Sequence, residues 1–209
     1  MRAPSGAHPR AVRRFGDAIT EDEVVTGDHV LTVPLDPTGA AFGPDETIEV
    51  YAREVRALDR ADVEAPYLVF LQGGPGQRSP RPGAEQPAWL AWALRRYHVV
   101  LLDQRGTGAS TPQHRHGLTA RVAREGVPAT VERVAQFRAD AIVADCEALR
   151  RHLLGDVPWT VLGQSFGGFC AWTYLSQAPQ GLAAAYVTGG VPPMTADVDT
   201  VYRLSLIHI

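Results

Sequence analysis

Lysine is absent from this 209-residue chain, and all 20 of its basic residues are arginine. Because the acidic residues number 23, the formal net charge at neutral pH is −3. A balance this close to neutral does not provide the basic surface that attracts nucleic acid or an anionic membrane. No apolar run approaches the roughly 20 residues that a membrane-spanning helix needs. We therefore expect neither nucleic acid nor a membrane as a partner.

Cysteine is also scarce. Cys146 and Cys170 each fall in a segment with a helical pattern, and this usage is typical of buried, reduced thiols rather than a disulfide. No Cys/His cluster has the spacing of a metal site, and we expect His114 and His116 in a solvated loop. The first residues carry several arginines without a following apolar segment, unlike a secretory signal. The expected location is cytoplasmic, and we expect no metal and no cofactor.

Apolar patterns predict strands that alternate with helices. Residues 47–55 alternate apolar and polar side chains, which indicates a half-buried antiparallel strand. Continuous apolar runs at 67–71 and 97–102 indicate parallel strands covered on both faces. Further strands are expected at residues 24–33, 159–162 and 184–188, and helices at 87–96, 130–154 and 168–175. This order predicts an α/β fold with a mostly parallel sheet whose first strands are antiparallel.

The clearest of the expected helices covers residues 130–154. Thr130 is the expected N-cap, and Gly155 is the expected terminator. One face of this helix is expected to pack on the sheet through apolar positions at helical spacing: Val134, Phe137, Ala141, Ala144 and Ala148.

The most informative motif is Gly163-Gln164-Ser165-Phe166-Gly167, placed between an expected strand and an expected helix. In that context G-x-S-x-G predicts a nucleophile elbow. Gly163 and Gly167 let the strand and the helix approach closely, while the turn holds the serine in a strained conformation. Ser165 is therefore the candidate nucleophile.

A second motif, Gly73-Gly74-Pro75-Gly76, directly follows the strand expected at 67–71. In a hydrolase built around such an elbow, this turn supplies one backbone N–H of an oxyanion hole, and the residue after the serine supplies the other. We assign these donors to Gly74 and Phe166, with Gly73 and Pro75 as structural support. Read alone, GGPG is also compatible with an ordinary Gly-Pro turn.

Asp103 and Arg105 follow the strand expected at 97–102. They are either catalytic charges or structural braces of the turn beside the oxyanion loop. We favour the structural role.

Together these motifs resemble proline iminopeptidases (prolyl aminopeptidases) of the α/β-hydrolase superfamily. The resemblance rests on GGPG at 73–76, DQRGTGAST at 103–111, the helical segment at 140–150 and GQSFGGF at 163–169, and it extends over about residues 24–203. GQSFGGFCAWTYLSQAP followed by TGGVPP resembles the longer-chain branch. The shorter branch has tryptophan and histidine where this chain has Phe166 and Gln72, a departure expected to affect the substrate pocket.

The resemblance implies an α/β-hydrolase fold and a serine peptidase that releases N-terminal proline from small peptides through an acyl-enzyme at Ser165. Two alternatives remain open. One is another α/β-hydrolase, such as an esterase or acyltransferase. The other is a non-catalytic ligand-binding protein that keeps the fold. A serine at the elbow argues against epoxide hydrolase or dehalogenase chemistry.

A serine nucleophile needs a histidine base and an orienting carboxylate, which follow it in this fold in the order Ser, Asp or Glu, His. Asp197 and Asp199 come after Ser165, but we interpret both as surface residues at the start of a cap. His208 lies in a segment that we expect to be foreign. The remaining histidines precede the serine and do not fit the order: His8, His29, His98, His114, His116 and His152. We therefore expect the triad Asp and His outside this chain.

The composition changes at the end of the chain. Isoleucine occurs three times before residue 204 and twice in residues 204–209. We interpret 204–209 as an adapter-derived tail, and a genuine hydrophobic strand is the alternative. The expected organisation is a loose segment at 1–20, the N-terminal part of a hydrolase core at 21–193, the start of a cap at 194–203 and the tail. On this interpretation the chain is a C-terminally truncated fragment without turnover, with the last core strands and most of the cap missing.

Overall fold

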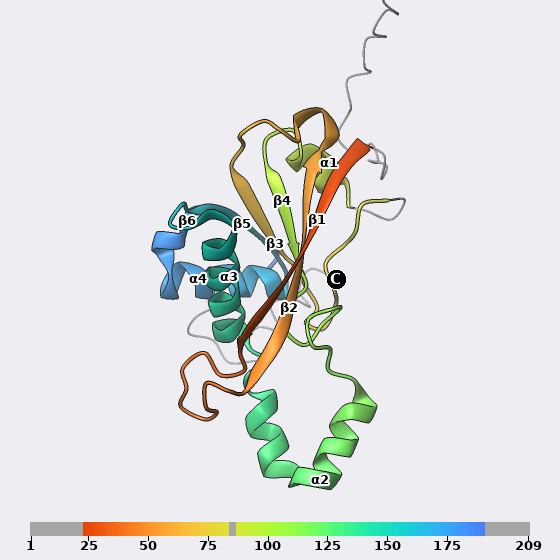
Figure 1. Ribbon diagram of the computed structural model, residues 1–209, viewed down its shortest axis with the longest axis vertical. Coiled ribbons are helices and arrows are strands. Elements are labelled where there is room, and N and C mark those ends of the chain that lie inside the picture. Colours follow the sequence, from red (N-terminus) through yellow and green to blue (C-terminus); the bar gives the residue numbers. More distant parts are fainter. Residues whose placement is uncertain (1–22, 84–86, 191–209) are drawn as a thin grey trace, which may run out of the picture.

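A computed structural model describes residues 23–83 and 87–190. The segments 1–20, 194–203 and 204–209, and with them His8, Asp197, Asp199 and His208, lie outside the described residues. One sheet organises the described part, with helices on both of its faces (Figure 1).

The sheet has six strands in the order β1-β2-β4-β3-β5-β6. Their bounds are β1 Val24–Pro34, β2 Thr47–Ala57, β3 Tyr67–Leu71, β4 His98–Leu102, β5 Trp159–Gln164 and β6 Leu182–Thr188. Strands β1, β2 and β4 pair antiparallel, whereas β4, β3, β5 and β6 pair parallel. The chain therefore forms the mostly parallel α/β sheet with antiparallel first strands that the pattern predicts.

Alternate residues of the central strands enter two apolar cores. In β3, Val69 and Leu71 pack toward α3 (Ala139–Leu154) and α4 (Phe166–Gln177), while Leu68 and Phe70 pack toward α1 (Ala88–Ala93). Strand β4 divides its side chains in the same way and is buried along its whole length. Because both faces are covered, β3 and β4 read as continuous apolar runs rather than alternating ones.

The expected strands are confirmed, as are the helix at 87–96 and the helix after the elbow, with shifts of a few residues at their ends. The single helix expected over 130–154 is wrong. The chain instead forms α2 (Arg115–Val134) and α3, separated by residues 135–138. At Arg138 the backbone is extended, so one continuous helix does not form here. The guanidinium of Arg105, from the turn after β4, donates a hydrogen bond to the carbonyl of Gln136 at 2.8 Å and holds the break in place.

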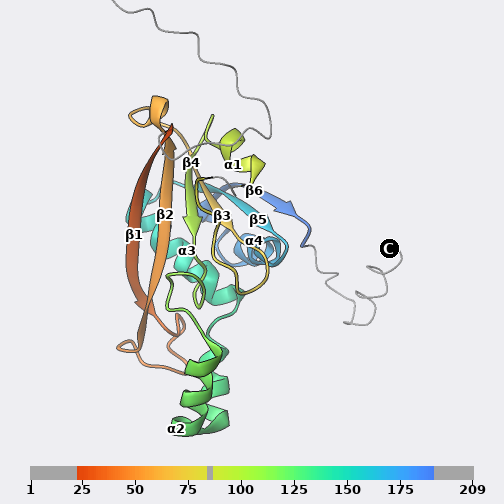
Figure 2. The same ribbon diagram turned by 90° about the vertical axis from the view of Figure 1, so that its right-hand side faces the viewer.

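The sequence pattern does not predict α2, because this helix lacks a clear apolar face and Thr130 is its one buried residue among those described. Gly126 has φ 84° and kinks the helix just before Pro128, so α2 consists of two helical arms (Figure 1), which together extend away from the sheet (Figure 2). His114 is the exposed N-cap of α2 and lies in the loop before it, as expected, whereas His116, also exposed, lies in the first turn of the helix.

The face of α3 that packs on the sheet agrees only in part with the expected one. Ala141 is buried, and Phe137 and Ala148 pack half-buried against the core. The buried core residues of α3 are Ala139, Ile142, Val143, Cys146 and Leu149, and Ala144 is only half-buried. Val134 belongs to α2 and is exposed. Both cysteines are buried free thiols, and burial raises the pKa of Cys170 to about 12.

Candidate active site

Ser165 occupies a sharp turn between the end of β5 and the first residue of α4. Its backbone lies at φ 53° and ψ −116°, a region that costs a non-glycine residue about 1–3 kcal/mol. Hydrogen bonds hold the turn: the Ser165 amide donates to Thr188 at 2.8 Å, and the Gly168 amide donates to the Ser165 carbonyl at 2.9 Å. Ser165 is exposed, so the turn leaves the serine side chain accessible from solvent.

The two motif glycines allow this turn because no side chain would fit at either position. A Cβ on Gly163 would collide with the carbonyl of Gly167. A Cβ on Gly167 would collide with the carbonyl of Leu71, the last residue of β3. The first turn of α4 therefore lies directly against the ends of β5 and β3.

The GGPG turn lies beside the serine. A Cβ built on Gly73 would be 3.0 Å from the Cβ of Ser165 and 3.6 Å from its Oγ. The Gly73 amide donates to the side chain of Gln72 at 2.9 Å, so this N–H is already engaged. The amides of Gly74 and Phe166 have no hydrogen-bond acceptor within the part of the chain that the structure describes. Two free main-chain donors thus come from the two loops that meet at Ser165.

Asp103 lies in the turn after β4, fully buried. It accepts hydrogen bonds from the Ser79 amide at 2.9 Å, the Arg81 guanidinium at 2.8 Å and the Ala109 amide at 3.0 Å. These contacts tie the segment after the GGPG turn to the turn after β4. Its oxygens are therefore occupied by structural partners.

Arg105 is buried and holds four segments together. It makes a bidentate ion pair with Asp145 of α3, at 2.7 and 2.6 Å, and donates to the carbonyls of Leu35 and Gln136. Burial raises the pKa of Asp145, although the Arg105 guanidinium opposes that shift. The pair braces the turn after β4 against α3 and the loop after β1.

Two further groups that support the site were not singled out by the sequence. Gln104, almost fully buried, donates to the Gln72 carbonyl at 3.0 Å and so joins the turn after β4 to the GGPG turn. Tyr174 of α4 donates to Glu147 of α3 at 2.5 Å and accepts from Trp159 of β5 at 3.0 Å. In the sequence, these supporting groups are indicated only by polar side chains within or directly after otherwise apolar segments.

Comparison with known proteins fits this geometry. The family described as alpha/beta hydrolase fold matches residues 66–206. The chain belongs to the alpha/beta-hydrolase fold family.

Two curated proteins are similar to most of this chain. A proline iminopeptidase of Aeromonas sobria is 47% identical over 175 residues, which cover 84% of this chain and 40% of the relative. A proline iminopeptidase of Aspergillus aculeatus is 42% identical over 161 residues, covering 72% of this chain and 34% of the relative. The chain thus spans well under half the length of the curated relatives that it matches.

Among solved structures, the Mycobacterium tuberculosis protein Rv0554 superposes with a TM-score of 0.50 at 20% identity, covering 86% of this chain and 53% of that one. A likeness at this identity shows the fold alone.

In this alpha/beta-hydrolase fold, the structure does not bring a described histidine to the elbow. His98 begins β4 and is buried, and His29 on β1 lies 3.2 Å from Glu54 of β2. The rings of His29 and His152 pack in a T-shaped, edge-to-face arrangement, with their centroids 6.1 Å apart. Strands β4, β3 and β5 are parallel. Ser165 follows the carboxyl end of β5, whereas His98 is at the amino end of β4, so the two residues lie at opposite ends of the strands.

No helix among the described residues has both the length and the apolar character to span a membrane. No group of three or more His, Cys, Asp and Glu side chains in that part of the chain is arranged to hold a metal ion.

Proposed function

We propose that this chain carries the nucleophile of a serine hydrolase that releases N-terminal proline from small peptides. The observation that supports it most directly is an exposed serine at φ 53°, set beside a turn whose Gly73 lies in contact with it. The names of the curated relatives supply the peptide class, and the proposal concerns the whole protein.

The proposed reaction begins when Ser165 Oγ attacks the carbonyl carbon of the N-terminal proline. The carbonyl oxygen becomes an oxyanion and accepts hydrogen bonds from the amides of Gly74 and Phe166. A histidine base, oriented by a carboxylate, takes the serine proton and gives it to the departing amine of the next residue. Water then hydrolyses the prolyl ester on Ser165, which releases proline and restores the hydroxyl. No described residue fills the roles of base and carboxylate, so we place both outside the described part of the chain.

Two further proposals concern the setting. The described elements form one sheet, which supports a single core unit over residues 21–193. The two buried free thiols support a reducing compartment, and we propose the cytoplasm.

The test is hydrolysis of a chromogenic prolyl amide by the protein encoded by the complete open reading frame. Ser165→Ala should lower kcat/KM by roughly 10⁴-fold or more because the acyl-enzyme cannot form. Ser176→Ala is the matched control, since Ser176 is an exposed serine of the same helix, and it should leave the rate unchanged. Faster turnover of short acyl esters than of prolyl amides would favour an esterase, and no turnover of either would favour a non-catalytic protein.

A further inference from the structure

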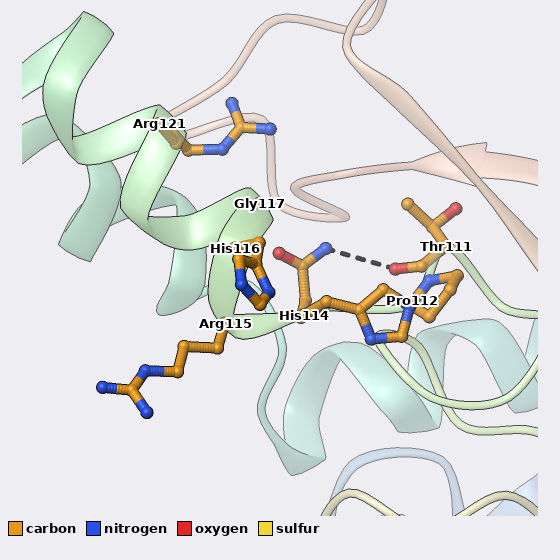
Figure 3. A pocket seen from close by; sticks show the side chains of 8 residues that line it. Thr111, Pro112, His114, Arg115, His116, Gly117 and Arg121 are labelled. Atoms are coloured by element: carbon orange, nitrogen blue, oxygen red, sulfur yellow. Dashed lines mark hydrogen bonds between the residues drawn. The ribbon is translucent and has the colours of Figure 1, made fainter.

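A cavity of about 840 Å³ opens at the start of α2, lined by residues 111–117 and Arg121 (Figure 3). Its lining includes two arginines and two histidines, and no acidic residue of the described chain lines it. Figure 3 shows Arg115 and Arg121 extending to opposite sides of His116. The lining therefore offers cationic groups and no described carboxylate.

Its cationic groups differ in how far they are already paired. Arg121 contacts Glu125 at 3.1 Å, one helical turn away, so part of its charge is compensated. His114, Arg115 and His116 make no side-chain hydrogen bond or ion pair with any residue that the structure describes. A guanidinium presents paired donors that match the two oxygens of a carboxylate, which makes Arg115 the principal candidate contact.

The position of this cavity relative to Ser165 follows from the sheet. Thr111 Oγ1 accepts from the Glu49 amide at 2.9 Å and donates to the Glu49 carbonyl at 3.0 Å, near the start of β2. Because β2 is antiparallel to β4, its start lies at the same edge as the ends of β4, β3 and β5. From β2 to β5 there are three strand spacings, a lateral distance of about 14 Å between these two strands. Since α2 runs from there away from the sheet (Figure 2), the cavity lies at least that far from Ser165.

We propose that this cavity binds the C-terminal carboxylate of the peptide substrate. The inference rests on the proposed function and deepens it by naming the substrate class. An extended peptide advances about 3.3 Å per residue, so a peptide of at least about five residues is needed to bring its carboxylate to the cavity when its proline carbonyl is at Ser165. Shorter peptides and peptides blocked as C-terminal amides lack this contact.

The test compares free-acid and C-terminally amidated peptides that begin with proline, from dipeptide to octapeptide, on the protein encoded by the complete open reading frame. Arg115→Ala should raise KM for free acids of about five residues or more by about two- to fivefold, the range of an exposed ion pair, with kcat unchanged. It should leave the amides and a chromogenic prolyl amide unaffected. Arg124→Ala, an exposed arginine of the same helix outside the cavity, is the control and should change none of these values.

Each remaining outcome has one meaning. If free acids and amides have equal KM at every length, or if Arg115→Ala raises both equally, the cavity does not bind the carboxylate. If the chromogenic prolyl amide is cleaved while the acid preference is absent, this inference fails and the proposed function stands. If no prolyl substrate is cleaved at all, the proposed function fails first. The melting temperature of each variant identifies a change that arises from loss of folding.

Discussion

At the scale of single residues, the site depends on positions where any side chain would collide with backbone. Gly167 is the sharpest case, because its missing Cβ leaves room for the carbonyl that ends β3. Gly117 on α2 is the opposite case, since a Cβ there meets nothing within 4 Å.

This contrast gives a matched pair of substitutions. We expect Gly167→Ala to lower the free energy of unfolding by about 1–3 kcal/mol, because α4 must move away from β3. Gly117→Ala should leave it unchanged or raise it by up to about 1 kcal/mol, since alanine is the better helix former. Urea unfolding followed by circular dichroism measures both. Equal stability of the two variants would contradict the packing of the elbow helix described above.

At the scale of elements, buried ion pairs and polar contacts fix how the helices and turns meet. The Arg105–Asp145 pair joins the turn after β4 to α3, and the Tyr174–Glu147 contact joins α4 to α3. Both link segments that lie far apart in the sequence.

Asp145→Asn tests the first of these links. The change leaves the Arg105 guanidinium buried without its anion, which typically costs about 3–5 kcal/mol. Asp156→Asn, at an exposed position just after α3, should change the free energy of unfolding by less than about 0.5 kcal/mol. Chemical unfolding of both variants measures the difference. Similar losses for both variants would mean that the ion pair does not brace the turn.

The elements themselves could be predicted where the pattern is local. Strand β3 was expected at its observed bounds because a continuous apolar run between turn residues allows few alternatives. The closeness of Gly73 and Ser165 follows from the order of strand ends along one edge. The break between α2 and α3 at residues 135–138 could not be predicted, because Arg105, which donates a hydrogen bond to the Gln136 carbonyl there, comes from the turn after β4. Helix α2 lacks an apolar face against the sheet, so periodicity gave no signal for it.

At the scale of the whole molecule, the fold contains a buried histidine whose charge state should govern stability in mild acid. Within residues 23–83 and 87–190, neither ring nitrogen of His98 makes a hydrogen bond of good geometry, and the His98 ring lies 5.1 Å from that of Tyr67. Burial, together with the charge of Arg56, lowers the pKa of His98 below 6.5. The ionisable side chains that face the His98 ring are those of Glu54, Arg56 and Tyr67, and these three are hydrogen-bonded to one another.

The sign of the effect follows from the direction of this shift. Below pH 6.5 the unfolded chain binds a proton at His98 that the folded chain resists, so stability is present above that pH and is lost as the pH falls. The His98→Phe variant should lose this dependence between about pH 6.5 and 5, a window above the titration of Glu54, whose pKa is also lowered. Melting temperatures of the two proteins across that range measure the effect. Identical slopes would mean that His98 does not carry it.

The most direct test of the central claim, that Ser165 becomes acylated, is mass spectrometry of the complete protein quenched with acid during turnover of a prolyl ester. We predict an adduct of one prolyl group on the peptide that contains Ser165, and none in the Ser165→Ala variant. An adduct on another residue, or release of proline with no adduct in protein trapped before deacylation, would contradict the account.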